Sequence, residues 1–218
     1  MHDQDIHPIM MALRAAVPAW QTPIVDVMAQ QDETPYKILI TTMLSLRTQD
    51  TTTGPASQRL FALASTPAAM LTLSAETIEK AIYPVGFYKV KAQNVLQVSR
   101  ILLESYQGET PSTIEELVKL PGVGRKVANL VLTMGFGLPG ICVDTHVHRI
   151  TNRWGYVQTR TPEKTEFALR AKLPPAYWIE INGHLVALGQ NICHPTSPRC
   201  SQCPLSAWCE RVGVTRSR

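Results

Sequence analysis

The chain has 218 residues, of which 44% are hydrophobic and 17% are charged, close to the composition of an ordinary globular protein. This composition excludes a collagen, a long coiled coil and a largely disordered chain, and no apolar run is long enough to span a bilayer. The first residues, MHDQDIHPIM, lack the basic start and apolar core of a secretory signal. We therefore expect a soluble, intracellular protein.

The net charge of +4 is distributed unevenly. Residues 1–35 contain one arginine and five acidic residues and carry −4, so the remainder of the chain carries +8. An excess of positive charge is compatible with a polyanionic partner, although many proteins without such a partner reach this value. Charge alone leaves the question of a nucleic-acid partner open.

Apolar residues recur at helical spacing along almost the whole chain, and capping residues mark several helix starts. In chain order, the predicted helices are 35–46, a short helix after Thr66, a helix capped by Ser74, a long helix over Tyr88–Tyr106 that stops at Gly108, a short helix after a capping box at 112–115, 127–136, 144–153 and 175–189. Alternating β-branched runs between hairpin turns are missing, so few strands are expected. The predicted fold class is all-α.

A glycine-rich segment, Leu120–Lys126, lies between two apolar helical segments. Gly122 and Gly124 permit a tight turn with exposed N–H groups, and the positive end of the next helix can bind a phosphate. A simple turn between two core helices is the alternative. With its apolar flanks, the segment resembles a helix-hairpin-helix, which binds the DNA backbone. Val123 and Arg125 are then candidate DNA contacts together with the two glycines.

Lys126 is expected in the first turn of the helix that follows, next to Arg125. A lysine near such a turn is usually a phosphate contact or a solvated charge. The helix terminus and the neighbouring cation both disfavour the ammonium form, however, and a lysine nucleophile must be a neutral amine. Lys126 is therefore a candidate nucleophile.

Asp144, in the sequence VDTHVHR, has two interpretations. An aspartate just before a helix is a common N-cap worth about 1 kcal/mol, and the residues alone favour this interpretation. The alternative is a carboxylate fixed at the mouth of a cleft. His146 and His148 are two residues apart, so on a helix they point to different faces and are not expected to share a metal.

Four of the five cysteines lie close together near the end of the chain, at Cys193, Cys200, Cys203 and Cys209. Thiols that cluster so tightly in an intracellular chain indicate a metal site rather than disulfides. A single C-x-x-C does not fit a two-knuckle zinc ribbon, which leaves a cubane iron–sulfur cluster or a distorted zinc site. Cys142 stands alone in an apolar segment and is expected in the core.

The order LPGVGRKVANLVL, VDTHVHR and C-x6-C-x2-C-x5-C resembles the endonuclease III family of DNA glycosylases, over nearly the whole chain from Pro35 to Cys209. The resemblance implies two helical lobes with a DNA-binding cleft. A six-helix barrel at residues 28–138 would contain the helix-hairpin-helix. Residues 1–27 and 139–218 would form the second lobe and hold a [4Fe–4S] cluster on the four clustered cysteines.

The resemblance also implies an activity. Lys126 would be the nucleophile and Asp144 the essential carboxylate of a bifunctional enzyme, which removes a damaged, oxidised pyrimidine from double-stranded DNA and cleaves the abasic site by β-elimination. Relatives that remove adenine or mismatched thymine lack a lysine at the position of Lys126. A monofunctional glycosylase and a DNA-structure-binding module without activity remain as alternatives. We expect a monomer in the cytoplasm, associated with the nucleoid.

Several candidate DNA contacts depart from the family pattern or extend it. Arg47 stands where relatives commonly have glutamine, and Phe87 stands where a leucine wedge is usual. These residues would fill the gap left by a flipped base, and Lys91 and Arg199 would be further DNA contacts. The ordinary alternatives are a salt-bridged Arg47 and a core Phe87.

Overall fold

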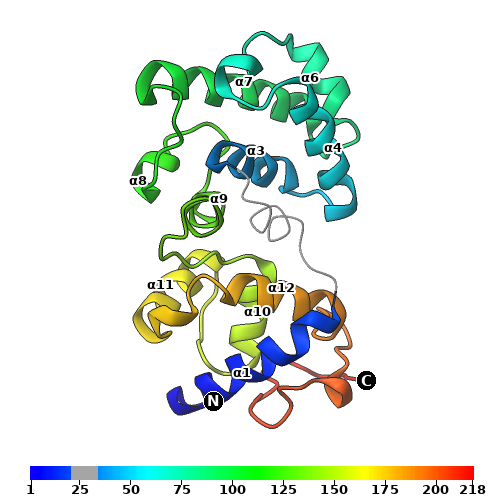
Figure 1. The fold of residues 1–218 in the computed structure, drawn as a ribbon. Helices are drawn as coiled ribbons and strands as arrows, with labels where there is room; N and C mark the ends of the chain where they lie inside the picture. Colours follow the sequence, from blue (N-terminus) through cyan, green and yellow to red (C-terminus); the bar gives the residue numbers. More distant parts are fainter. Residues whose placement is uncertain (21–33) are drawn as a thin grey trace. The chain divides into compact units, whose positions relative to one another are not determined.

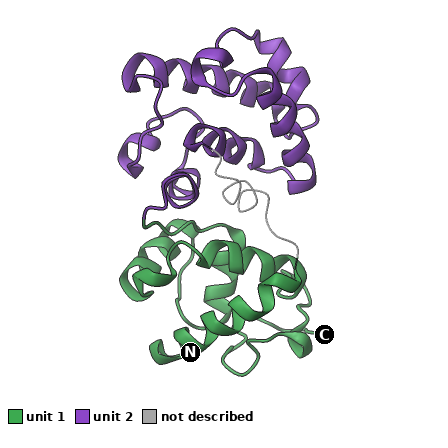
Figure 2. Ribbon diagram, in the orientation of Figure 1, with its two compact units in different colours: residues 1–23, 139–218 green, residues 24–138 purple. Residues whose placement is uncertain are grey.

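The computed structural model describes residues 1–20 and 34–218, and within these ranges the protein is helical and has no β-strand. This confirms the all-α prediction. The chain forms two compact units, of which unit 1 comprises residues 1–23 and 139–218 and unit 2 comprises residues 24–138 (Figure 2). The domain boundary expected between residues 27 and 28 lies outside the described residues. In the described ranges, no helix has both the length and the apolar character needed to cross a bilayer.

Unit 2 is built around one helix that is buried along nearly its whole length (Figure 1). The helices of this unit are α3 (Pro35–Ser45), α4 (Asp50–Leu63), α5 (Pro67–Met70), α6 (Ala75–Ile82), α7 (Tyr88–Tyr106), α8 (Ile114–Leu117), α9 (Arg125–Leu130) and the π-helical turn η3 (Val131–Gly135) that continues α9. The central helix is α3, and α4, α7, α9 and η3 pack against it. Because partners surround α3, its apolar residues are not restricted to one stripe.

Hydroxyl caps begin several of these helices, as the sequence predicts. Thr66 accepts from the amide of Ala69 and Ser74 from the amide of Thr77. The predicted capping box is wrong by one residue, because the cap of α8 is Thr113, which accepts from the amide of Glu116.

Helix α4 was not among the predicted helices, because it contains Gly54 and Pro55, which disfavour a helix interior. Gly54 is buried, and Ala56 and Leu60 are fully buried on the same helix. Packing of this face against α3 and α6 outweighs the local preference of the two residues.

Unit 1 joins the N-terminal helix to the C-terminal part of the chain. Its elements are η1 (Asp3–Asp5), α1 (Ile6–Ala16), η2 (Val17–Ala19), α10 (Thr145–Arg153), α11 (Pro162–Lys172), η4 (Pro175–Tyr177), α12 (Ile181–Asn191) and η5 (Cys200–Gln202). Ile9, Met10 and Leu13 of α1 are fully buried in the core of this unit, where α12 contacts both α1 and α10. Cys142 is buried in the same unit, as predicted.

The helix predicted over 175–189 is in fact two elements, η4 and α12, with a break before Ile181. Aromatic side chains anchor the first element: the Tyr177 hydroxyl meets the His7 ring, and the Trp178 indole donates to the carbonyl of Leu173 at 2.8 Å. Their burial imitates the periodicity of a continuous helix, which explains the error.

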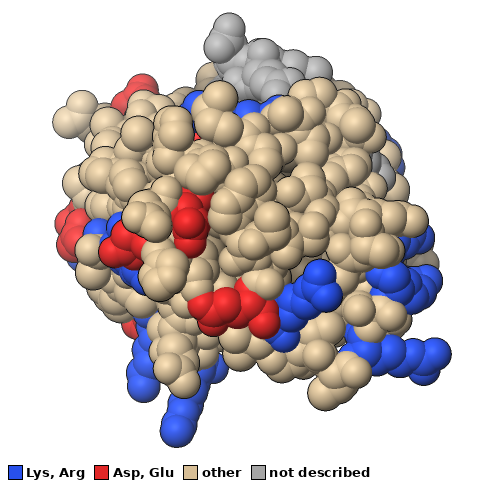
Figure 3. Space-filling model, turned by 90° about the horizontal axis from the view of Figure 1, so that it is seen from below, with Lys and Arg blue, Asp and Glu red and all other residues tan. Residues whose placement is uncertain are grey.

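Charged side chains of both signs occur on the face shown in Figure 3. Acidic side chains lie at the left and in the centre of this view, and lysine and arginine side chains lie mostly at the bottom and lower right, on a largely uncharged surface. Charges of both signs therefore share this face.

Candidate functional site

The glycine-rich turn between α8 and α9 needs its first glycine for two reasons. Gly122 has a φ of +78°, and a Cβ there would lie 2.7 Å from Nδ2 of Asn94 on α7. Gly124, the N-cap of α9, has nothing within 4 Å of an added Cβ, so the backbone at this position is open. An open backbone before a helix allows close approach of a large anion.

Val123 belongs to the turn itself and corrects the sequence prediction. Its amide donates to the carbonyl of Leu120 at 3.1 Å, and its side chain is buried. Because both groups are used within the protein, Val123 shapes the turn rather than donating to DNA.

Lys126 lies in the first turn of α9, and its side chain is exposed. The next residues, Val127 and Ala128, are buried in the core of unit 2, so packing of these residues fixes the helix that carries the lysine. Arg125 precedes it with a partly exposed side chain. The arrangement presents a primary amine beside an open glycine backbone.

Asp144 is the N-cap of α10, which confirms the capping interpretation. Its Oδ1 accepts from the amide of His146 at 2.8 Å and from that of Val147 at 2.9 Å. Both of these bonds fall on one oxygen, and the side chain is only partly buried. The cap fixes the orientation of the carboxylate, which does not exclude a further role. Lys126 belongs to unit 2 and Asp144 to unit 1.

The two histidines after Asp144 have separate partners, as their spacing predicts. Nδ1 of His146 lies 3.1 Å from Nη2 of Arg149, and a Cβ at Gly189 would overlap the His146 ring. Nδ1 of His148 lies 2.7 Å from the Thr165 hydroxyl.

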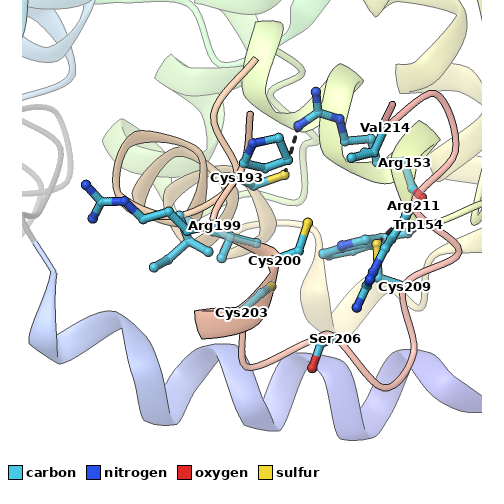
Figure 4. A pocket seen from close by; sticks show the side chains of 13 residues that line it. Arg153, Trp154, Cys193, Arg199, Cys200, Cys203, Ser206, Cys209, Arg211 and Val214 are labelled. Carbon is cyan, nitrogen blue, oxygen red and sulfur yellow. Dashed lines mark hydrogen bonds between the residues drawn. The ribbon is translucent and has the colours of Figure 1, made fainter. Parts of the chain in front are cut away.

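The four clustered cysteines surround one pocket in unit 1 (Figure 4). Trp154, Leu188 and Ile192 provide the apolar lining of this pocket. Within the described residues, no three His, Cys, Asp or Glu side chains converge as ligands of a single metal ion. Sulfurs arranged around a cavity, rather than about a point, fit a group larger than one ion.

The thiols in this pocket need a positive partner to ionise. Burial raises the pKa of Cys203 to about 11 and also raises the pKa of Cys209. Iron–sulfur clusters bind cysteine as the thiolate, and metal binding supplies the free energy that removes these protons. The donor set and the cavity therefore fit a four-cysteine cluster.

Helix α10 supports the cysteine loop directly. Nη1 of Arg153 donates to the sulfur of Cys193 at 3.3 Å (Figure 4). It also donates to the carbonyl of His194 at 2.6 Å, and Nη2 of Arg149 donates to the carbonyl of Cys193 at 2.8 Å. The helix that Asp144 caps thus also anchors the first cysteine. Arg199 lines the pocket with an exposed side chain, and its amide donates to the carbonyl of Ile192.

Arg47 and Phe87 lie at the tips of two loops of unit 2 and point toward each other. The Phe87 side chain is 62% exposed, so a core role is wrong. The Arg47 guanidinium lies over the Phe87 ring, 5.8 Å from its centroid. Among the described residues no salt bridge of Arg47 is found, which does not support the salt-bridged alternative.

Lys91 is not a surface contact, and the prediction that it binds DNA is wrong. Its side chain is 7% exposed, and Nζ donates to the carbonyls of Leu44 and Leu46 and to the Thr48 hydroxyl. All three donors of the ammonium group are in use. The sequence contains the signal, because Lys91 continues the buried stripe of α7 through Val95.

Comparison with known proteins identifies the family. A family model described as "HhH-GPD superfamily base excision DNA repair protein" matches residues 40–175. Endonuclease III of Thermotoga maritima is 49% identical over 176 residues, which cover 81% of this chain and 83% of that protein. The chain belongs to the endonuclease III family of DNA glycosylase/abasic-site lyases.

Solved structures of the endonuclease III family agree with this assignment. A non-covalent endonuclease III–DNA complex matches with a TM-score of 0.84 and 30% identity, covering 97% of this chain and 96% of that one. A trapped endonuclease III–DNA covalent intermediate matches with a TM-score of 0.84 and 30% identity, covering 97% of both chains. The resemblance inferred from the three motifs is confirmed.

Proposed function

We propose that this chain removes oxidised pyrimidines from double-stranded DNA and cleaves the resulting abasic site, with Lys126 as the nucleophile. The observation that carries the proposal is the exposed Lys126 on the first turn of α9, two residues after the open backbone of Gly124. Membership of a family with a trapped covalent DNA intermediate supports it.

The reaction begins after the damaged nucleotide has left the base stack. The neutral amine of Lys126 attacks C1′ of the sugar, and the C1′–base bond breaks, with its electron pair leaving on the base, which takes up a proton. The negative charge of Asp144 stabilises positive charge at the sugar, and its carboxylate accepts the proton that the attacking amine loses. The nitrogen electron pair then forms a C1′=N double bond as the C1′–O4′ bond breaks, which gives a protonated imine and an O4′ hydroxyl that has taken up a proton.

The imine makes strand cleavage possible. Loss of a proton from C2′ converts the imine into an enamine. Its electron pair then forms the C2′=C3′ double bond as the C3′–O3′ bond breaks, and the 3′ strand leaves as the phosphate ester. Water then hydrolyses the imine and restores the amine of Lys126. One lysine therefore performs base release and β-elimination.

DNA binding would use three groups of residues. The backbone at Gly122 and Gly124 and the side chain of Arg125 would meet phosphates beside the lesion. Arg47 and Phe87 would enter the gap that the flipped nucleotide leaves. Arg199 would contact the backbone from the cysteine loop. We propose that the protein acts as a monomer on DNA in the cytoplasm, at the nucleoid.

A [4Fe–4S] cluster would be held by Cys193, Cys200, Cys203 and Cys209. When bound, the cluster supplies a covalent cross-link among segments that have little regular structure of their own. Arg153 would donate to the Cys193 sulfur, and Trp154 would cover one side of the site. We assign the cluster a structural role, since the proposed catalytic residues lie outside the loop.

Borohydride trapping tests this function, because the reagent reduces an imine into a stable amine. Parent protein and a duplex that contains one oxidised pyrimidine should give a covalent protein–DNA adduct, and Lys126→Gln should give none while still binding the duplex. Base release without an adduct from the parent would instead indicate a monofunctional glycosylase. Binding without base release would indicate a DNA-structure-binding module.

A further inference from the structure

Two loops of unit 2 hold their exposed tips in a backbone conformation that side chains rarely adopt. Arg47, between α3 and α4, has a φ of +54°, and Phe87, between α6 and α7, has a φ of +59°. Left-handed backbone at a non-glycine residue costs free energy and persists only where surrounding contacts enforce it. The structure shows which contacts do so.

The first loop is tied from inside by the Lys91 ammonium of α7. Nζ donates to the carbonyl of Leu44 at 2.7 Å, to the carbonyl of Leu46 at 2.6 Å and to the Thr48 hydroxyl at 3.2 Å. These acceptors lie on both sides of Arg47 along the chain. One buried cation therefore fixes the loop on either side of its tip.

The second loop is tied to the first through the same hydroxyl. Oγ1 of Thr48 accepts from the Gly86 amide at 3.1 Å, directly before Phe87. A Cβ at Gly86 would lie 2.9 Å from the carbonyl oxygen of Arg47, so only glycine permits this approach. Lys91, Thr48 and Gly86 thus connect the two tips.

We propose that Lys91 is a positioning residue for damage recognition, which holds Arg47 and Phe87 together as one probe that enters the duplex opposite the lesion. The inference rests on the proposed function and deepens it. Lys91 itself does not touch DNA, because its donors are used within the protein. Arg47 would donate hydrogen bonds to the orphan base and would therefore favour a base with an acceptor-rich edge. The Phe87 ring would separate the neighbouring bases.

The test compares Lys91→Met with Lys89→Met. Methionine keeps the length of the side chain and removes the donors, whereas Lys89 is an exposed lysine on the same helix. The control variant Lys89→Met therefore removes one positive charge and leaves the hydrogen bonds of Lys91 in place. Thr48→Val, which removes only the shared hydroxyl, is the second variant if Lys91→Met does not fold.

Two readouts separate positioning from general destabilisation. The first is single-turnover cleavage of one oxidised pyrimidine opposite each of the four bases. The second is the fluorescence of 2-aminopurine placed opposite an uncleavable abasic analogue, which rises when the probe unstacks that base. Both use the full chain at a temperature where circular dichroism shows each variant to be folded.

We expect the parent to discriminate among opposite bases by about tenfold or more. Lys91→Met and Thr48→Val should reduce this ratio to about twofold and lower the fluorescence rise, and Arg47→Ala should add little in the Lys91→Met background, since coupled residues are not additive. Lys89→Met should keep the parental profile. The logarithmic salt dependence of binding should be unchanged in Lys91→Met.

Four results would overturn the proposal. The first three are a parental opposite-base profile in Lys91→Met, an equal loss of rate for all four opposite bases in Lys91→Met with the fluorescence rise retained, and a parent protein that gives no fluorescence rise. The fourth is a salt slope of binding that falls by about 0.9 in Lys91→Met, as the loss of one phosphate contact would give. Borohydride trapping of the parent on the same duplexes separates these four results from failure of the proposed function. If the proposed function failed, the parent would form no adduct.

Discussion

At Lys91, burial of an ammonium group implies a measurable pH dependence of stability. Burial lowers its pKa from 10.5 to about 8, and its three hydrogen-bond acceptors are uncharged. Between these two values the unfolded chain binds the proton and the folded chain does not, so the free energy of unfolding rises with pH across that window. Below about pH 8 the buried charge costs its full amount.

Urea unfolding of the parent and Lys91→Met between pH 7 and pH 10 checks this dependence. The parent should gain stability relative to the variant by on the order of 2 kcal/mol across this range. Lys89→Met serves as the control and should follow the parent. A constant difference between the parent and Lys91→Met would show that Lys91 keeps an ordinary pKa.

Arg47 stands where relatives commonly have glutamine, and the two side chains differ chemically. Glutamine donates and accepts, whereas arginine only donates and therefore favours the O6 and N7 acceptors of guanine. A lesion opposite guanine should be cleaved at least as well as one opposite adenine, Arg47→Gln should flatten the preference, and Arg47→Ala should slow all four substrates. One shared rate profile for the three proteins would show that Arg47 does not reach the orphan base.

Residue types alone could not place Lys91 correctly and left Phe87 open between a DNA wedge and the core. A lysine near a suspected DNA surface suggests a phosphate contact, yet Lys91 lies on the buried face of α7. An aromatic residue between two helices suggests the core, yet the left-handed backbone of Phe87 and the close approach of Gly86 direct it outward. Both outcomes depend on contacts between loops that are distant in sequence.

The start of α10 combines a cap with a proposed catalytic charge, and these roles can be separated. Asparagine caps helices about as well as aspartate, so Asp144→Asn should leave the melting temperature close to that of the parent. Loss of the negative charge should slow base release by roughly 3–4 kcal/mol in activation free energy.

The same variant should lose less on a ready-made abasic site, because no base remains to be expelled. Single-turnover rates on the two substrates provide the comparison, with Lys126→Gln as the variant that is inactive on both. If Asp144→Asn released bases at the parental rate, Asp144 would be a helix cap alone.

The cysteine loop should depend on iron for its order. Anaerobically purified parent should be coloured, with about four iron atoms per chain and broad visible absorbance. Cys203→Ser should lower iron content and thermal stability more than it lowers the rate of base release by the protein that remains folded. Colourless parent protein that contains one zinc would contradict the cluster.

Local chemistry predicts some elements and packing decides others, although α11 was not predicted despite its Thr161 cap and Pro162 start. Helix α7 has the predicted bounds, because an apolar stripe runs from its start to the stop at Gly108. Helix α4 was missed because its glycine and proline argue against a helix until α3 and α6 are packed on it. The break between η4 and α12 was missed because buried aromatic side chains imitate helical periodicity.

For the whole molecule, family and reaction class follow from three motifs whose order in the chain is more informative than any one of them. The turn at Gly122 and the cap at Asp144 each have an ordinary structural explanation, and the four cysteines alone indicate only a metal site. Only their joint occurrence points to one chemistry. Motifs do not reveal the hydrogen bonds by which Lys91 connects the two loops, because the acceptors are backbone carbonyls and a hydroxyl.

The most direct measurement of the central claim is to locate the bond between protein and DNA. After borohydride reduction on a duplex with one oxidised pyrimidine, proteolysis and mass spectrometry should find the deoxyribose remnant on the Lys126 side chain. Lys126→Ala should bind the duplex and yield no such peptide. A remnant on another lysine or on the N-terminal amine, or an adduct that persists in Lys126→Ala, would contradict the account.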